Sequence, residues 1–161
     1  MSYVRGVKYL GYSFYVMKGK CELTVHPKSK AKMKSRLKEL TSRSNGWGYA
    51  KRKQKLKEYI RGWVGYYHLA NMKRLLLETD EWLRHRIRMC IWKAWKRVKT
   101  KVANLIRCGI KKYQAYEWGN TRKGYWRIAD SPILKRAIDN NNLCSAGYAT
   151  LMGSYLEWHP K

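Results

Sequence analysis

Acidic side chains are the groups most often used for acid–base and metal-assisted chemistry, and this sequence contains few of them. The 161 residues include 10 Asp plus Glu against 36 Lys plus Arg. The only closely spaced acids are Glu78, Asp80 and Glu81. Two-metal phosphoryl transfer needs clustered carboxylates, whereas an N-cap at Thr79, followed by acids in the first helical turn, explains this group structurally. The sequence therefore predicts no catalytic carboxylate pair.

The histidines and cysteines also lack the spacing of a catalytic or metal site. No histidine has a Ser or Cys partner in a recognisable nucleophile motif, and no Gly-rich phosphate-binding loop is present. The cysteines form no Cys-x-x-Cys pair and have no His at zinc-ligand spacing, which argues against a zinc site and a disulfide framework. We therefore expect no metal site, and no catalysis by this chain alone. The histidines are His26, His68, His85 and His159, and the cysteines are Cys21, Cys90, Cys108 and Cys144.

Positive charge is the strongest functional signal, with a formal net charge of +26. From Arg84 to Lys112 no acid interrupts the basic residues, whereas ordinary solvated faces mix both signs. Such clustering predicts binding to a polyanion. No run of about 18 apolar residues is present to span a membrane, and the N-terminus lacks the apolar core of a secretory signal. We expect a cytoplasmic, reduced protein.

The hydrophobic patterning predicts a mainly α fold that begins with a β-hairpin. Alternating residues indicate a hairpin from Val7 to Val25, with its turn at Lys18-Gly19-Lys20. Helical periodicity then predicts one helix from Ser29 to about Ser44, with Met33, Leu37 and Leu40 on one apolar stripe. It predicts another helix from about Tyr49 to Ala70. Two glycines of the second helix, Gly62 and Gly65, each cost roughly 1 kcal/mol relative to Ala. They predict close approach by another helix or by a phosphate backbone.

A third helix is expected to begin near Thr79 and to have two different faces. One stripe is apolar and should form the core, whereas the other mixes rings with cations that we expect to be solvated. The apolar stripe consists of Leu83, Ile87, Cys90, Ile91, Ala94 and Val98. The other face consists of Trp82, His85, Arg88, Met89, Trp92, Lys93 and Lys96.

The remaining residues predict short helices separated by turns. One should end at Gly109, and another should run from about Lys112 to Trp118. A turn-rich basic segment should follow from Asn120 to Arg127. Ser131 at N-cap with Pro at the first helical position then starts a helix that should stop at Asn140-Asn141-Asn142.

Five stretches, taken in order, resemble the C-terminal part of a group II intron reverse transcriptase/maturase. The stretch from Gly6 to Phe14 is similar to the hairpin that closes the palm and leads into the thumb. The other four are Arg61 to Tyr67 and Trp82 to Arg88, similar to the maturase-specific thumb helices, then Ile91 to Arg97 and Arg122 to Ala129.

The resemblance implies three regions and an RNA partner. Residues 1–26 would be the palm-to-thumb hairpin, residues 27–100 the thumb-like helical bundle (X domain), and residues 101–161 a small, basic helical tail. Such a region grips group II intron RNA to assist splicing, and in a complete reverse transcriptase it holds the template–primer duplex. The fingers and the palm with its catalytic carboxylates would lie outside this chain and remain possible partners.

Charge and resemblance together give the candidate site residues. The cations are expected to contact RNA phosphates, and two tryptophans are candidates for base stacking, with core packing as the competing interpretation of each ring. We expect no cofactor bound by the chain itself, and magnesium associated with the RNA. The cations are Lys51, Lys55, Arg61, Arg88, Lys93, Lys96, Arg122, Lys123 and Arg127, and the rings are Trp92 and Trp126.

Two alternative functions remain open from the sequence. In the first alternative, the chain is a non-catalytic piece of a split RNA-directed DNA polymerase and would copurify with a palm-containing partner. In the second, it is a basic membrane-surface protein. Basic helices bearing Trp also lie on anionic bilayers, but a chain this compact needs its apolar stripes for folding. Liposome flotation separates the membrane alternative from RNA binding.

Overall fold

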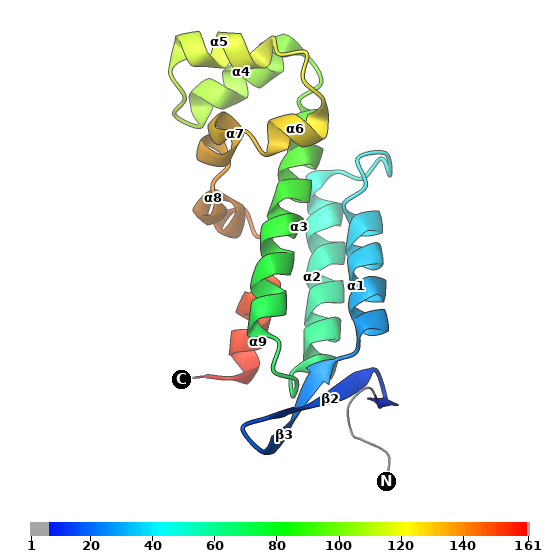
Figure 1. Ribbon diagram of the computed structural model, residues 1–161. Helices are drawn as coiled ribbons and strands as arrows, with labels where there is room; N and C mark the ends of the chain where they lie inside the picture. The colour runs from blue at the N-terminus through cyan, green and yellow to red at the C-terminus, as the bar shows by residue number, and fades with distance from the viewer. Residues whose placement is uncertain (1–6, 161) are drawn as a thin grey trace. The chain divides into compact units, whose positions relative to one another are not determined.

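The computed structural model describes residues 7–160 and divides them into two compact units. Gly6 of the predicted hairpin stretch lies outside the described residues. Within the described range, three strands precede nine helices, which confirms the mainly α class (Figure 1). The first unit comprises residues 7–40, 48–80 and 149–160, and the second comprises residues 41–47 and 81–148. None of the described helices combines the length and apolar content that crossing a bilayer requires.

The first unit opens with the predicted hairpin. Strands β1 (Lys8–Tyr9), β2 (Tyr12–Met17) and β3 (Lys20–Val25) form one antiparallel sheet in that order. Met17 pairs with Lys20 across the tight turn, where Lys18 and Gly19 both have left-handed φ values of 51° and 76°. Two consecutive positive φ values match the right-handed twist of the strands. The hairpin is therefore confirmed, with β1 as an additional short strand.

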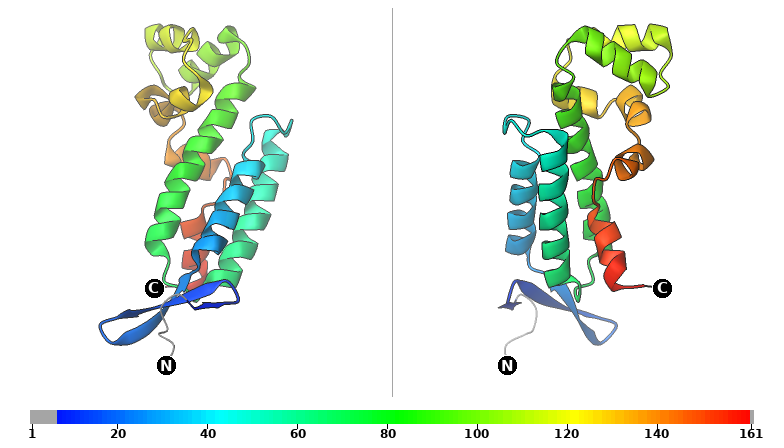
Figure 2. Two further views of the ribbon diagram at one scale, coloured as in Figure 1. Left: turned by 45° about the vertical axis from the view of Figure 1, so that its right-hand side comes forward. Right: turned by 180° about the vertical axis from the view of Figure 1, so that it is seen from behind.

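Two long helices follow the hairpin and lie side by side, with the sheet across one end (Figure 2). They are α1 (Pro27–Leu40) and α2 (Tyr49–Tyr67), and α9 (Leu151–Trp158) packs on α2. The predicted apolar stripe of α1 is buried, and so are three aliphatic side chains of α2. These core residues are Met33, Leu37 and Leu40 from α1, and Leu56, Ile60 and Val64 from α2.

The α2 glycines have different surroundings. A Cβ atom at Gly65 would lie 3.5 Å from the Trp158 indole, so α9 provides the predicted close helix there. At Gly62 a Cβ atom would have no described neighbour within 4 Å. Helix α9 therefore lies at ordinary contact distance from Gly65, and no described neighbour requires glycine at either position.

Helix α3 (Lys73–Ala94) begins one and a half turns earlier than predicted and contributes to both units. Thr79 is not its N-cap, because the Thr79 hydroxyl lies within the helix and donates to the Leu75 carbonyl at 2.7 Å. That bond satisfies a buried hydroxyl without ending the helix. Asp80 is buried and instead accepts backbone N–H bonds from Leu151 and Met152 at the start of α9. The predicted capping role of Asp80 was thus assigned to the wrong helix.

In the second unit, α3 is covered on more sides than its apolar stripe predicts. Leu83, Ile87 and Cys90 are buried as expected, but so are Arg88 and Trp92 from the face expected to be solvated. Segments on two sides cover the helix, since Cys90 donates to the Thr41 carbonyl while Arg88 donates to Ile138. The expected division of this helix into a core face and a solvated face was wrong.

Five short helices complete the second unit. Gly119 packs tightly on α4, since a Cβ atom there would lie 2.6 Å from a Val102 methyl carbon. The Ser131 N-cap is confirmed, because its hydroxyl accepts from the Leu134 N–H. The predicted stop at Asn140 was wrong, because Asp139 caps a further helix there by accepting from Asn142. The helices are α4 (Val98–Arg107), α5 (Lys112–Gly119), α6 (Tyr125–Ala129), α7 (Pro132–Ala137) and α8 (Asn140–Ser145).

Candidate nucleic-acid interface

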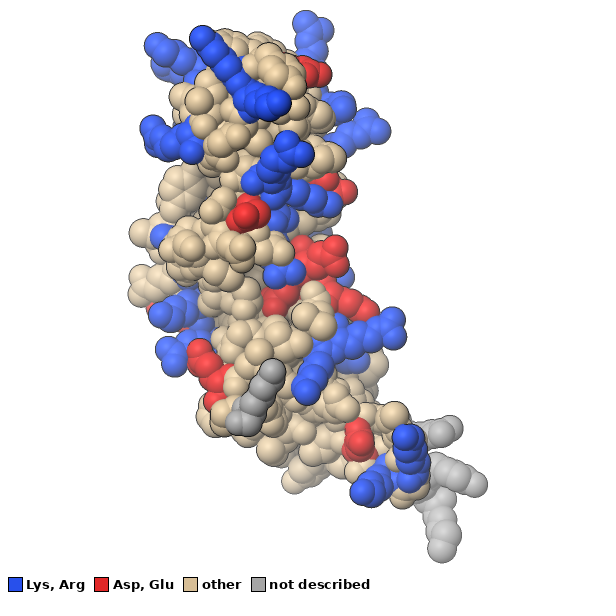
Figure 3. All heavy atoms as spheres, turned by 90° about the vertical axis from the view of Figure 1, so that its left-hand side faces the viewer, with Lys and Arg blue, Asp and Glu red and all other residues tan. Residues whose placement is uncertain are grey.

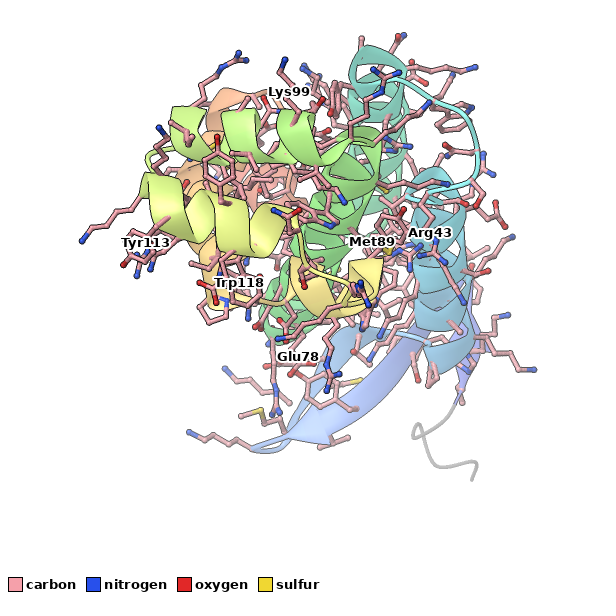
Figure 4. All side chains as sticks on the ribbon, turned by 90° about the horizontal axis from the view of Figure 1, so that it is seen from above. Arg43, Glu78, Met89, Lys99, Tyr113 and Trp118 are labelled. Atoms are coloured by element: carbon pink, nitrogen blue, oxygen red, sulfur yellow. The ribbon has the colours of Figure 1, made fainter. Side chains whose placement is uncertain are left out.

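Helices α4 and α5 of the second unit carry a cationic surface. Residues 82–129 contain a single acid, Glu117, and Figure 3 shows Lys and Arg side chains projecting from the α4–α5 region at the top of the view. Figure 4 shows Lys99 and Tyr113 directed away from these helices. Like charges gathered with so few acids raise the local concentration of phosphate groups. The exposed cations here are Lys96, Arg97, Lys99, Arg107, Lys111 and Lys112, named the α4–α5 cationic surface below.

A second group surrounds α6, where a ring and cations lie together on the surface. The Trp126 ring is 44% exposed and stacks on the His85 imidazole, with centroids 3.6 Å apart and planes 19° from parallel. The His85 Nε2 atom also lies 2.8 Å from the Trp126 carbonyl oxygen. This stack fixes the indole while leaving part of its surface exposed, which suits a base-stacking platform. Arg122, Lys123 and Arg127 are exposed beside it in sequence.

Two predicted site residues need correction because the structure buries them. Trp92 is 2% exposed, with the Lys101 ammonium group 4.8 Å from its ring centroid, so it packs in the core and cannot stack on a base in this conformation. Arg88 is 6% exposed. Its guanidinium donates to the Ile138 carbonyl at 2.7 Å and to the Asn140 side chain at 3.0 Å.

Burial also lowers the pKa of the Arg88 guanidinium, and neighbouring Arg84 lowers it further. Desolvation disfavours the charged form, and a like charge adds to that effect. Arg88 therefore holds the second unit together instead of presenting its charge to solvent.

Lys93 and Lys96, from the same predicted face, have different surroundings. The Lys93 ammonium donates to the Arg43 carbonyl at 2.7 Å, whereas Lys96 is exposed beyond the end of α3. The structure therefore brings Lys96 into the α4–α5 cationic surface and gives Lys93 a contact within the protein. Whether either contacts RNA stays a prediction.

The three predicted contact residues on α2 in the first unit are exposed, and two of them lie near acids. Lys55 pairs with Glu58 at 3.0 Å, and the Arg61 guanidinium lies 4.0 Å from the Glu157 carboxylate. Lys51 is also exposed. Ion pairs between exposed side chains contribute only about 0–1 kcal/mol. A phosphate can therefore replace the carboxylate partners of Lys55 and Arg61 at small cost.

A row of cations on α1 was not predicted from the sequence. Lys28, Lys32 and Arg36 recur every four residues and line one groove of the first unit together with rings of α2. The four-residue repeat could have revealed the row. The groove could not be foreseen, because its opposite wall comes from a different helix.

The aspartates bind groups of the protein and do not converge. Asp80 accepts from the start of α9, Asp139 caps α8, and Asp130 pairs with Lys135 at 2.7 Å. Hydrogen bonding to Lys135 lowers the pKa of the Asp130 carboxyl. Across residues 7–160, no three His, Cys, Asp or Glu side chains gather in a way that could hold a metal ion.

Comparison with known proteins identifies the central part of the chain. Residues 30–109 match the family model described as the group II intron, maturase-specific domain. The matched range extends from the first turn of α1 through α4 and includes part of the α4–α5 cationic surface. The chain has no match among the curated proteins. Residues 30–109, just under half of the sequence, are therefore similar to the group II intron maturase-specific domain.

Proposed function

We propose that this chain is an RNA-binding maturase module that binds folded group II intron RNA and assists its splicing. The observation that supports this best is the α4–α5 cationic surface, together with the exposed Trp126 ring beside Arg127 and the basic residues that precede α6. The match to the maturase-specific domain supports group II intron RNA as the partner. The surface supplies the means of binding, because cations that neutralise phosphates release condensed counterions.

In the proposed mechanism the protein stabilises the active fold of the RNA and does not itself form or break covalent bonds. A protein that binds only the active RNA fold shifts the population toward that fold by its differential affinity. The intron RNA then performs the reaction with its own magnesium. In a complete reverse transcriptase the same region would hold the template–primer duplex.

RNA binding can be tested with a structured group II intron transcript at increasing salt. Each phosphate that the protein neutralises contributes a slope of roughly −0.7 to −0.9 in log affinity against log salt. We expect a steep negative slope, and a slope that is less steep by about 1.4–1.8 for the double variant Lys111→Gln/Lys112→Gln. Lys18→Gln/Lys20→Gln, at the hairpin turn, is the control for losing two positive charges. A flat salt dependence would contradict the proposal.

Splicing provides the second measurement. We expect the protein to let the transcript splice at a magnesium concentration where the RNA alone is inactive. An unchanged magnesium requirement, with binding intact, would show that the protein binds the RNA without acting as a maturase.

A further inference from the structure

The first unit contains a groove of about 700 Å³ between the hairpin and helices α1 and α2. It is larger than the pocket of about 440 Å³ that lies beside β2, β3 and the start of α3 in the same unit. Its walls come from different elements: one from α1, one from α2, and one end from the residues that join β1 to β2. The two helical walls differ in chemistry.

The α2 wall consists of aromatic rings. Tyr59, Trp63 and Tyr67 recur every four residues and are half-buried, while Tyr66 is 52% exposed. The Trp63 and Tyr67 ring centroids lie 4.7 Å apart, and the Tyr66 ring meets Tyr67 edge-on at the same distance. Trp and Tyr are often only partly buried, because each has a flat apolar ring and a polar group. The four rings here all line the groove and present flat, partly wet surfaces to it.

The α1 wall carries three cations and one acid, Glu39, among small and apolar side chains. Lys28, Lys32 and Arg36 follow one another at one-turn intervals, about 6 Å apart along the helix axis. Arg36 pairs with Glu39 at 2.7 Å, and both side chains are more than half exposed. The two lysines are exposed on the same wall. A row of positive charge thus lies opposite a row of rings.

The hairpin holds the end of the groove in a defined geometry. The Tyr66 hydroxyl donates to the Leu10 carbonyl at 2.8 Å, and the Ser29 hydroxyl donates to the Gly11 carbonyl at 3.1 Å. Gly11 has a left-handed φ of 85°, and a Cβ atom there would lie 2.3 Å from the Tyr67 hydroxyl oxygen. Only glycine fits this position without displacing Tyr67. The rings are therefore positioned before any ligand binds.

We propose that this groove binds unpaired nucleotides of RNA, with bases against the α2 rings and phosphates along the α1 cations. The inference rests on the proposed RNA-binding function and names the part of the RNA that this surface takes. Base stacking requires the flat face of a base, which a duplex hides between neighbouring pairs. A groove that combines a ring wall with a cationic wall matches the two components of single-strand binding.

The test compares a fluorescently labelled single-stranded uridine octamer with a hairpin RNA duplex of equal charge, by anisotropy with the full chain. Lys28→Gln/Lys32→Gln removes two groove charges. Lys34→Gln/Lys38→Gln removes two charges from the α1 side away from the groove and is the matched control. We expect the groove variant to weaken octamer binding about 10-fold and the control variant less than 3-fold.

The ring wall is tested separately. Stacking on a ring changes affinity by roughly 5- to 150-fold per base, so we expect Tyr66→Leu to weaken octamer binding at least 5-fold. Tyr66→Phe keeps the ring and should bind nearly normally, which separates stacking from the Leu10 hydrogen bond. Tyr49→Leu, at an exposed tyrosine of α2 that does not line the groove, is the control. Thermal melting of each variant shows that it is folded.

The outcomes separate this inference from the proposed function. If groove and control variants bind the octamer equally while the intron transcript still binds, the groove does not hold single strands and the inference is overturned. If the groove variants lose duplex binding as strongly as octamer binding, the site does not select unpaired nucleotides and the inference is again overturned. Failure of the wild-type chain to bind the intron transcript overturns the proposed function itself.

Discussion

The carboxylate of Asp80 holds the start of a helix that begins 71 residues later, at Leu151. Its two oxygens accept the backbone N–H groups of Leu151 and Met152 at 2.8 and 2.9 Å, and the side chain is 2% exposed. Thr150 accepts the next free N–H group, from Gly153. Three of the four N–H groups that open every helix are therefore satisfied by side chains. Through this contact, α3 fixes the C-terminal helix of the first unit.

Asp80→Ala should destabilise the chain, because it leaves buried N–H groups of α9 without acceptors. We expect a loss of roughly 1–3 kcal/mol in the free energy of unfolding, measured by urea denaturation. Glu81→Gln, at the adjacent exposed acid, is the control and should change stability by less than about 0.5 kcal/mol. Equal effects of the two substitutions would show that the contact with α9 contributes little.

Arg88→Gln and Lys96→Gln should affect different properties. Replacing Arg88 leaves the Ile138 carbonyl without its donor and should cost roughly 1–3 kcal/mol. Lys96 is exposed, so Lys96→Gln should leave the melting temperature nearly unchanged and weaken RNA binding in a salt-dependent way. Melting curves and RNA titrations on both variants provide the measurement. Normal stability of Arg88→Gln, with lost RNA binding, would mean that Arg88 contacts RNA directly.

Gly62→Ala should stabilise the chain and weaken RNA binding. Alanine is favoured over glycine in a helix interior by roughly 0.5–1 kcal/mol, and the site has room for a Cβ atom. Because no described residue requires glycine there, we attribute the small side chain to close approach of RNA. Denaturation and intron binding are measured together, with Gly65→Ala as the comparison beside Trp158. If the stabilised variant binds RNA normally, RNA does not approach α2 at Gly62.

The hairpin contains a carboxyl group whose titration should respond to one neighbour. Glu22 accepts hydrogen bonds from the Tyr15 hydroxyl and the Asn71 side-chain amide, and these bonds lower its pKa, with the Tyr15 bond the larger cause. A pKa that is lower in the folded state means that Glu22 stabilises the fold above its unfolded pKa. This contribution is lost as the pH falls through the folded pKa.

We expect Tyr15→Phe to raise the pKa of Glu22 toward its ordinary value, measured by NMR titration of the side-chain carboxyl carbon. Glu58 is the internal control, because its pKa is lowered by hydrogen bonds from Lys55 and Gln54 instead. The acid-dependent loss of stability should also become smaller in the variant. An unchanged Glu22 titration would mean that the Tyr15 bond does not form in solution.

Patterns between near neighbours in the chain predicted much of the fold. The turn at Lys18 and Gly19, the buried stripe through Met33 and Leu37, and the Ser131 cap all depend on residues a few positions apart. Steric preference, helical periodicity and capping act over such distances. The sequence also established the basic character of the surface, since net charge does not depend on how the chain folds.

Only the tertiary structure decided which side chains are exposed and which distant groups they contact. Thr79 and Asp80 form a sound helix-start signal, yet α3 continues through them because each finds another partner, and the partners of Asp80 lie more than 70 residues away. Arg88 and Trp92 are buried because segments distant in the sequence cover α3 on a face that periodicity assigns to solvent. Periodicity detects one apolar stripe, but a helix packed on several sides also buries polar groups when distant acceptors satisfy them. Those acceptors are set by long-range packing, which the local pattern does not encode.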